Sequence, residues 1–585
     1  MPKQSRRSFL RSAAAGAAAV ATAAPATADS PPPVATTAVT TTATTTAPAT
    51  TKPKPLPADD VAALVRSLGH DFTPPERAMM ADGLADRRDY LKKLRQRIID
   101  PRLEPAVQFN PRVPSVRYPT GDSRYAPPDV QVPDYNGDVR TLAFATVGEL
   151  SRLIHAGKLT STELTRMYLD RLDHVGRRLN AVITLTPDLA IRQAQRADQE
   201  LRSGRYRGPL HGIPYGAKDL LATKGIATTW GVKPFEHQAF DYDATVIEKL
   251  EQAGAVLCAK LSLGELAMGD VWFGGQTKSP WDPTRGSGGS SAGPAAAVAA
   301  GCVGFAIGSE TMGSIISPCM TNGVTGLRPT YGRVSRYGAM PLARTMDKIG
   351  PMCRGVEDCA MVLFAIHGAD ERDPTAARDV PFRFNGRSEL GELKVGFDVA
   401  AFEQIAKSKS AQRKGAYEQA LSALRGLAGG ELRPIQLPPT ENYTGLASLT
   451  IAADCAASFS EMVTSGQVRE LVQQGPGAWP DTFRKGMFIP AADYLRAQQL
   501  RSRLMRAMHE AMQGVDLYVT IPYAGPTIAY TNLTGHPTLV TRCGMVEGQP
   551  LMIELLAQPY REDAALRLGL AYEQSTQWSR TWPAI

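Results

Sequence analysis

A stretch of small residues between Gly286 and Pro318 constrains the fold of this chain more than any other segment. It reads GSGGSSAGPAAAVAAGCVGFAIGSETMGSIISP. The part AGPAAAVAAG predicts a short, tightly packed helix with Pro294 in its first turn. Two serines, Ser290 and Ser314, lie in glycine-rich turns on either side of it. Glycine permits turns whose backbone N–H groups converge and which a ligand can approach closely.

Two serines and one lysine are sufficient for a hydrolase that needs no histidine. A serine hydroxyl requires a nearby base and hydrogen-bond donors that face the developing oxyanion. Lys218, near the end of the segment HGIPYGAKDL, is a candidate base because burial lowers the pKa of a lysine. A second serine can relay the proton between nucleophile and lysine. The turn Thr311 to Ser314 can supply the oxyanion donors.

The same residues resemble the amidase signature family. Its two sequence blocks are similar to Gly288-Gly-Ser-Ser-Ala-Gly293 and Gly308-Ser-Glu-Thr-Met-Gly-Ser-Ile315, and further similarity covers GPLHGIPYGAKDLLATKGIATTWG, SPWDPTRGSGG and NLTGHPTLV. The resemblance is good over residues 140 to 370 and looser over 525 to 580. It implies an α/β fold with a large, mixed, twisted central sheet covered by helices on both faces.

The resemblance also implies roles for individual residues. Ser314 would form the acyl-enzyme, Ser290 would follow a cis peptide bond and bridge, and Lys218 would act first as base and then as acid. Ser291 would support this network. The remaining oxyanion and substrate-binding positions would be Thr311, Met312 and Gly313. The family requires no metal and no cofactor.

Two positions depart from the family pattern. Met312 replaces a glycine or aspartate, which keeps a backbone donor but makes the pocket wall bulkier and more apolar. Ile316 stands where many members carry an arginine that can hold a substrate carboxylate. From these two residues we expect an uncharged or apolar acyl group beside the scissile bond. The substrate itself stays open, and so does the oligomeric state.

Parts of the sequence also fit functions other than amide hydrolysis. Gly289 to Gly293 matches the G-x-S-x-G elbow of α/β-hydrolases, but the proline-containing stretch before it cannot form a central strand. An esterase or aryl-acylamidase using the same site, and a catalytically silent binding protein on the same fold, both remain alternatives. The eight histidines and seven cysteines form no zinc-type pairs.

The N-terminus predicts export. Ser5 to Arg11 (SRRSFLR) resembles a twin-arginine signal, followed by an alanine-rich region and the cleavage site Ala26-Thr-Ala28. Residues 29–57, rich in Thr, Ala and Pro, predict a disordered linker. We therefore expect a bacterial periplasmic or secreted enzyme. Export argues against a role with tRNA, which is cytosolic.

Charge and hydropathy give no indication of a nucleic-acid or membrane partner, and the family resemblance implies a small-molecule or peptide amide as the substrate. Residues 1–56 contain six basic residues and one acid, so they carry most of the net charge of +8. The remainder has an ordinary balance, which does not indicate nucleic-acid binding. No apolar run is long enough to span a membrane.

Local signals divide the chain into a signal peptide (1–28), the linker (29–57), a helical N-terminal extension (58–140) and the main domain (141–585), with a variable channel region at 371–525. Capping-box patterns predict that helices begin directly after Thr73, Thr146 and Thr160. Strands are predicted at 181–185, 255–261, 303–308 and 394–398. Helices are predicted at 188–203, 413–428 and 491–514. Their alternation indicates an α/β layered core.

Overall fold

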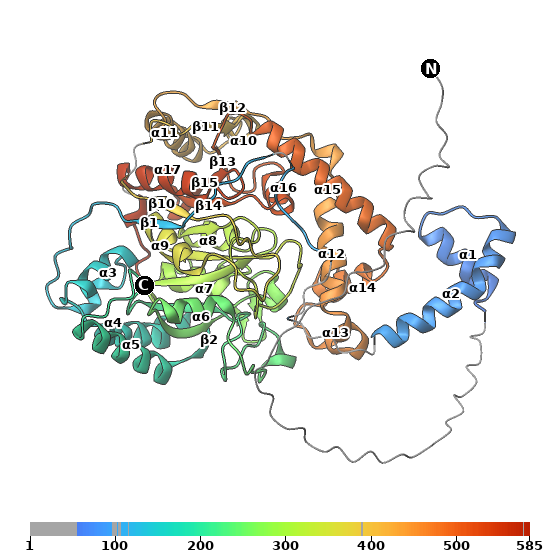
Figure 1. Cartoon of the computed structure of the whole chain (residues 1–585), viewed down its shortest axis with the longest axis horizontal. Helices are drawn as coiled ribbons and strands as arrows, with labels where there is room; N and C mark the ends of the chain where they lie inside the picture. The colour runs from blue at the N-terminus through green and yellow to red at the C-terminus, as the bar shows by residue number, and fades with distance from the viewer. Residues whose placement is uncertain (1–54, 96–101, 103–106, 115, 388–389, 577) are drawn as a thin grey trace, which may run out of the picture. The chain divides into compact units, whose positions relative to one another are not determined.

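A computed structural model describes residues 55–95, 102, 107–114, 116–387, 390–576 and 578–585 (Figure 1). The predicted signal peptide lies outside these residues, as does the linker up to residue 54. The chain divides into two compact units, Met1–Leu94 and Arg95–Ile585. The division falls before the boundary expected at residue 140.

The first unit contains two helices in its described part, α1 (Ala58–Ser67) and α2 (Pro74–Arg95). Val61, Val65 and Ala85 are buried. Helix α2 begins as its sequence predicts, because Glu76 accepts hydrogen bonds from the backbone N–H and the hydroxyl of Thr73.

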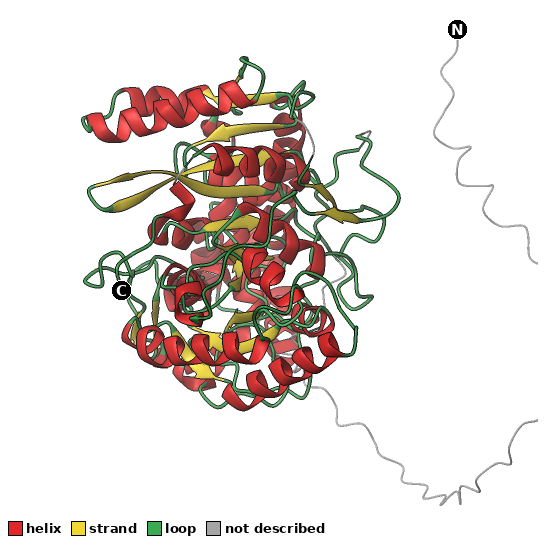
Figure 2. Ribbon diagram, turned by 90° about the vertical axis from the view of Figure 1, so that its left-hand side faces the viewer, coloured by secondary structure: helices red, strands yellow, loops and turns green. Residues whose placement is uncertain are grey.

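The described part of the second unit is built on an eleven-stranded mixed sheet (Figure 2). The order across it is β12 (Arg433–Ile435), β11 (Val395–Asp398), β13 (Leu517–Thr520), β15 (Gln549–Ala557), β14 (Thr538–Val546), β8 (Thr325–Arg328), β9 (Lys348–Cys353), β7 (Phe305–Glu310), β3 (Pro214–Lys218), β4 (Val256–Leu261) and β2 (Val182–Leu185). This confirms the predicted fold class.

Alternate residues of the central strands belong to two different hydrophobic cores. Ala306 and Val540 pack with one core, whereas their neighbours Ile307 and Leu539 pack with the other. Because successive side chains of a strand point to opposite faces, both faces of the sheet are buried. Such a sheet requires a layer of helices on each side.

Helices supply both layers. The first core holds α7 (Ala292–Ala299) and α8 (Ile316–Asn322), and the second holds α3 (Val147–His155), α4 (Ser161–Arg171), α6 (Thr245–Gln252), α9 (Val356–Ile366) and α17 (Glu562–Ser575). The capping boxes at Thr146 and Thr160 are both formed. Helix α5 (Pro187–Arg202) and helix α11 (Ala411–Leu427) lie at their predicted places.

A cluster of helices from the variable region lies beside the sheet in Figure 1. It contains α12 (Leu446–Ser458), α13 (Ser460–Ser465), α14 (Trp479–Gly486) and α15 (Ala491–Ala511). Trp479 and Phe483 stack at 5.1 Å, and Phe483 stacks on Phe459 at 5.0 Å. These aromatic side chains are therefore core residues of the cluster. Within the described residues, no helix is long and apolar enough to cross a membrane.

The parallel pairing of β3 with β7 determines where the chemistry lies. Tyr215 is opposite Phe305 and Ala217 is opposite Ile307. The carboxyl ends of both strands therefore meet at one edge of the sheet, which is where open α/β sheets place their ligands. Lys218 ends β3 at this edge, and the turn that carries Ser314 follows β7.

One buried ion pair joins the loop after β8 to helix α17, and it leads to a prediction about stability. The two Glu562 oxygens accept hydrogen bonds from the Arg333 guanidinium and the Thr330 N–H, and both charged side chains are almost completely buried. Glu562→Ala should lower the free energy of unfolding by about 3–5 kcal/mol, because it leaves Arg333 buried without its carboxylate. Urea unfolding measures this change.

A matched control removes an exposed partner. Glu371 pairs with Arg378 at 3.1 Å, but both side chains are mostly in water. Glu371→Ala should cost less than about 1 kcal/mol. Equal losses in the two variants would contradict the structural role assigned to Glu562.

Candidate active site

Lys218 is enclosed by three serine hydroxyls. Its Nζ lies 2.9 Å from Ser290 Oγ, 3.0 Å from Ser291 Oγ and 2.9 Å from Ser309 Oγ. The residue is 0% exposed. Burial lowers the pKa of the amine to about 7, although Asp347 and Glu310 oppose this effect. A large fraction of Lys218 is therefore neutral near pH 7.

The loop that carries Ser290 is closely packed against the backbone. A cis peptide bond joins Gly289 to Ser290. A Cβ atom at Gly289 would lie 1.8 Å from the Gly269 carbonyl oxygen, so only glycine fits there. Ser291 Oγ donates to the Ser309 carbonyl at 3.1 Å and accepts from the Ser309 N–H at 3.2 Å. Ser291 thus ties the end of β7 to this loop.

The turn from Thr311 to Ser314 presents backbone donors. Gly313 adopts φ +89°, which favours glycine, and a Cβ atom there would meet the Tyr523 hydroxyl at 2.2 Å. The N–H groups of Met312, Gly313 and Ser314 find no acceptor among the described residues. Three consecutive unpaired N–H groups beside a serine are the arrangement that an oxyanion hole requires.

Ser314 stands at the end of this turn. Its residue is half-buried, and its carbonyl oxygen accepts from the Ser291 N–H at 3.1 Å. Its hydroxyl makes no hydrogen bond with the described residues, so the expected link between the Ser290 and Ser314 hydroxyls is not formed here. Met312, two residues before Ser314, is 40% exposed.

A buried carboxylate holds the nucleophile turn in place. Glu310 Oε2 accepts from the N–H groups of Ile315 and Ile316 at 2.9 and 3.1 Å. Its other oxygen accepts from Arg328 at 2.6 Å and from Asn532 at 2.8 Å. Burial raises the pKa of Glu310, but the Arg328 guanidinium outweighs it, and the pKa is lowered to about 2. Glu310 is therefore a fixed anion behind Ser314.

The structure corrects the expectation for Ile316. Its side chain is completely buried and packs in the core beneath α8 with Cys319. It therefore does not face the position of a substrate, and it carries no information about the charge of the acyl group. The sequence position alone could not show this, because the direction of the side chain depends on how α8 is rotated against the sheet.

Sequence reasoning did not single out Ser309 and Asp347. Ser309 lies inside the second of the two sequence blocks, but its hydroxyl reaches Lys218 only because β3 and β7 pair. Asp347 accepts from the Thr311 hydroxyl at 2.5 Å and from the N–H groups of Leu342 and Ala343 at 2.9 Å each. It thus ties the oxyanion turn to the loop before β9.

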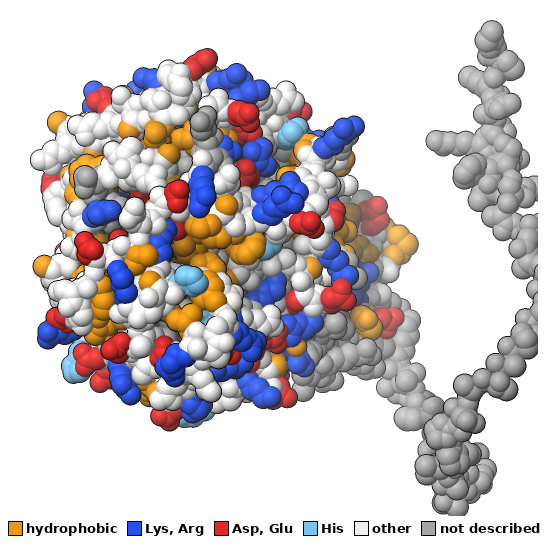
Figure 3. All heavy atoms as spheres, turned by 60° about the vertical axis from the view of Figure 1, so that its left-hand side comes forward, with side chains coloured by type: hydrophobic (Ala, Val, Ile, Leu, Met, Phe, Trp, Pro, Cys, Tyr) orange, Lys and Arg blue, Asp and Glu red, His pale blue; other side chains and the backbone are white. Residues whose placement is uncertain are grey.

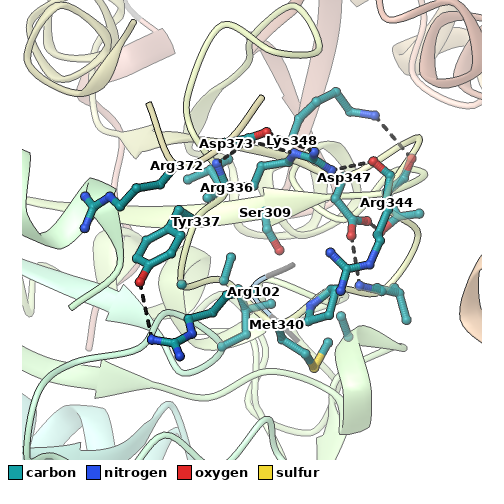
Figure 4. A pocket seen from close by; sticks show the side chains of 18 residues that line it. Arg102, Ser309, Arg336, Tyr337, Met340, Arg344, Asp347, Lys348, Arg372 and Asp373 are labelled. Carbon is teal, nitrogen blue, oxygen red and sulfur yellow. Dashed lines mark hydrogen bonds and ion pairs between the residues drawn. The ribbon is translucent and has the colours of Figure 1, made fainter. Parts of the chain in front are cut away.

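A pocket opens beside Ser309 and Thr311 (Figure 4). The loop 336–348 forms much of its wall, and Leu220 and Ala267 line another side. Its charged lining side chains are Arg102, Arg336, Arg344, Asp347, Lys348, Arg372 and Asp373. Ser309 thus both lines the pocket and contacts the Lys218 amine.

Comparison with known proteins identifies the family. The Amidase family model matches residues 163–543. The chain belongs to the amidase family. It is 35% identical over 484 residues to the A chain of the glutamyl-tRNA(Gln) amidotransferase of Chloroflexus aurantiacus, covering 75% of this chain and 98% of that protein.

Solved amidases have the same fold. The peptide amidase of Stenotrophomonas maltophilia matches with a TM-score of 0.67 and 30% identity, covering 76% of this chain and 99% of that one. An amidase family protein from Bacillus anthracis matches with a TM-score of 0.67 and 26% identity, covering 79% of this chain and all of that one. Among the described residues, no group of His, Cys, Asp or Glu is arranged to hold a metal.

The electrostatics of Lys218 predict a pH profile. If neutral Lys218 is the base, kcat/KM for an amide should fall as the pH decreases below about 7, because the amine becomes protonated. The Asp347 carboxylate raises the pKa of Lys218, so Asp347→Asn should move this acid limb to lower pH. Rate measurements from pH 5 to 9 test both statements.

The control is Asp563→Asn, which changes a carboxylate that pairs with Arg561 at the start of helix α17 rather than with the site. It should leave the acid limb in place. An acid limb that stays fixed in Asp347→Asn, or that moves to higher pH, would contradict the electrostatic account.

Proposed function

We propose that this chain is an exported amidohydrolase that cleaves a carboxamide C–N bond through an acyl-enzyme on Ser314. The observation that carries the proposal is the 2.9 Å contact between Lys218 Nζ and Ser290 Oγ, with the lysine fully buried and its pKa lowered to about 7. A general base is most effective in proton transfer when its pKa lies near the pH at which the enzyme works.

The proposed mechanism requires the Ser314 hydroxyl to turn toward Ser290 Oγ, because these two hydroxyls are not hydrogen-bonded in this structure. Ser314 Oγ attacks the amide carbon while its proton passes to Ser290 Oγ, and the Ser290 proton passes to the neutral Lys218 Nζ. The N–H groups at Met312 to Ser314 stabilise the oxyanion. As the C–N bond breaks, the proton returns through Ser290 to the leaving amine. Water then attacks the acyl-enzyme by the same route and releases the carboxylic acid.

The other two serine hydroxyls around Lys218 hold its amine beside Ser290. Ser291 and Ser309 also contact the Lys218 amine, so the lysine has little freedom to leave Ser290. Glu310 fixes the backbone after Ser314, and Gly313 leaves space for the Tyr523 hydroxyl. Precise positioning of this kind lowers the barrier because the reacting groups need no reorganisation.

Similarity to one chain of an amidotransferase favours a second candidate function. The match extends over nearly the whole length of that relative, so an amide-transferring role that depends on partner chains is the alternative. The export signal expected at residues 1–28 and the likeness to a peptide amidase support hydrolysis by this chain without tRNA. Hydrolysis of a simple amide by the purified chain alone separates the two functions.

Labelling of the nucleophile tests the proposal. A fluorophosphonate probe should add once to the purified chain, and peptide mass spectrometry should place the adduct on Ser314. Ser314→Ala should not be labelled, and Lys218→Ala should react at least ~100-fold more slowly because the general base is lost. Turnover of a matched amide and ester pair then distinguishes an amidase from an esterase.

The control is Ser502→Ala, which removes an exposed hydroxyl on α15 that bonds to the helix backbone. It should be labelled at the rate of the unchanged chain. An adduct on another serine, or amide turnover by Ser314→Ala, would refute the assignment. A folded chain that neither reacts nor turns over any amide would favour a silent binding protein.

Export is tested separately. Replacing both Arg6 and Arg7 by Lys should keep the full-length chain in the cytoplasm of a bacterial host with a twin-arginine pathway. The unchanged chain should appear outside the cytoplasm, shortened by 28 residues if Ala28 precedes the cleavage site. Fractionation with N-terminal sequencing gives both results. Export that is independent of the two arginines would overturn this part of the proposal.

A further inference from the structure

A second lysine is buried behind the turn that carries Ser314. Lys348 begins strand β9 and lies directly opposite Glu310, the last residue of β7. Side chains that lie opposite each other in an antiparallel pair project from the same face of the sheet. Lys348 is 2% exposed, and its amine reaches past the end of β7 to Thr311 (Lys348 is labelled in Figure 4).

The Lys348 amine bonds to two backbone carbonyl groups. Its Nζ donates to the Thr311 carbonyl oxygen at 3.4 Å and to the Met346 carbonyl oxygen. Burial lowers the pKa of this amine well below its usual range. Both bonds are compatible with a neutral amine, because a neutral amine still has two N–H donors. The side chain therefore links the start of β9 to the first residue of the oxyanion turn in either protonation state.

The Thr311 carbonyl group determines the direction of the next N–H group. The peptide bond after Thr311 is trans, so its C=O and the Met312 N–H lie in one plane and point to opposite sides. Because the Thr311 oxygen faces Lys348, the Met312 N–H faces away from the lysine. This N–H group finds no acceptor among the described residues, so it is available as a donor to a substrate oxygen.

Lys348 and Glu310 hold opposite ends of the same turn. Glu310 accepts from the N–H groups of the two residues that follow Ser314. Lys348 donates to the carbonyl oxygen of Thr311, three residues before Ser314. Asp347 binds the hydroxyl of Thr311 and not its backbone, so the orientation of this peptide group depends on Lys348.

We propose that Lys348 is a positioning residue of the oxyanion hole, which directs the Met312 N–H toward the oxygen of the scissile amide. The proposal rests on the proposed function and adds to it a residue that does not touch the substrate. An oxyanion hole is effective because its donors are fixed before the reaction begins. Without the Lys348 amine the peptide group after Thr311 can rotate, and the hole loses one directed donor while Lys218 keeps its serine contacts.

Lys348→Met removes the amine and leaves the neighbouring carboxylates with their donors. Glu310 keeps two side-chain donors and two backbone N–H groups. Asp347 keeps the Thr311 hydroxyl and two backbone N–H groups. Replacing a buried charged group by an apolar group of similar volume is often tolerated when no opposite charge is left unpaired. We therefore expect the variant to fold.

The experiment measures how fast a fluorophosphonate probe reacts with Ser314. The phosphoryl oxygen takes the oxyanion position as the bond to Ser314 forms, so the rate constant kinact depends on the hole, whereas KI reports reversible binding. In Lys348→Met, kinact should fall at least ~10-fold and KI should change less than ~3-fold, since loss of one oxyanion donor costs about 10²–10³ in rate. Lys348→Arg, which keeps N–H donors, should restore part of kinact.

Measurement at pH 9 separates positioning from an effect of charge. Removing a cation raises the pKa of a neighbouring amine, and this slows the reaction only where the ammonium form of Lys218 is populated. The pKa of Lys218 is about 7, so its amine is mostly neutral at pH 9. The loss of kinact should persist at pH 9. A loss that is present at pH 7 and absent at pH 9 would show that Lys348 acts through its charge, which overturns the positioning role.

The matched control is Lys249→Met. Lys249 lies on α6, and its amine also donates to backbone carbonyl oxygens, those of His367 at 2.6 Å and Gly368 at 2.7 Å, directly after helix α9. This variant should keep the kinact of the unchanged chain. The yield of adduct and the midpoint of urea unfolding are measured for every variant. A purely structural role of Lys348 would lower the yield or the midpoint and leave kinact unchanged.

The possible results separate the two proposals. If Lys348→Met does not fold, Lys348→Gln replaces it, because its amide is polar but one bond shorter and out of reach of the Thr311 oxygen. An unchanged kinact in the folded variant, or an equal loss in Lys249→Met, overturns the role of Lys348 and leaves the hydrolase intact. Absence of an adduct on Ser314 in the unchanged chain overturns the proposed function and the role of Lys348 with it.

Discussion

The burial of one lysine amine among serine hydroxyls is the constraint on which the site depends. An ammonium group in this position would carry a large desolvation penalty, and the three hydroxyls that contact Lys218 offset only part of it. The pKa of Lys218 therefore lies near 7 rather than near 10. The fold supplies the position, because Lys218 ends a central strand that is covered on both faces.

Fixed charges around the lysine keep its two protonation states balanced. Glu310 remains ionised because Arg328 pairs with it, and it holds the turn of Ser314 through two backbone N–H groups. Asp347 ties Thr311 to the loop before β9. On the face shown in Figure 3, basic and acidic side chains are mixed, and no region carries charge of only one sign.

Local features of this protein could be predicted from sequence, and features that depend on distant pairing could not. Capping boxes at Thr146 and Thr160 determine where helices begin, since the interaction lies within four residues. The fold class followed from the alternation of strands and helices and from the family resemblance. Ser309 and Asp347 were missed because their contacts arise only when β7 pairs with β3 and when the loop 336–348 turns back to meet Thr311. Ile316 was misjudged for the same reason.

The most direct test of the account is the titration of Lys218 itself. Lysine labelled with ¹³C at Cε, assigned by comparison with Lys218→Met, gives the pKa of this amine by NMR from pH 5 to 11. The account predicts a midpoint near pH 7, as burial requires. A midpoint near the ordinary value of about 10.4 would mean that the amine is charged at neutral pH and cannot serve as the base.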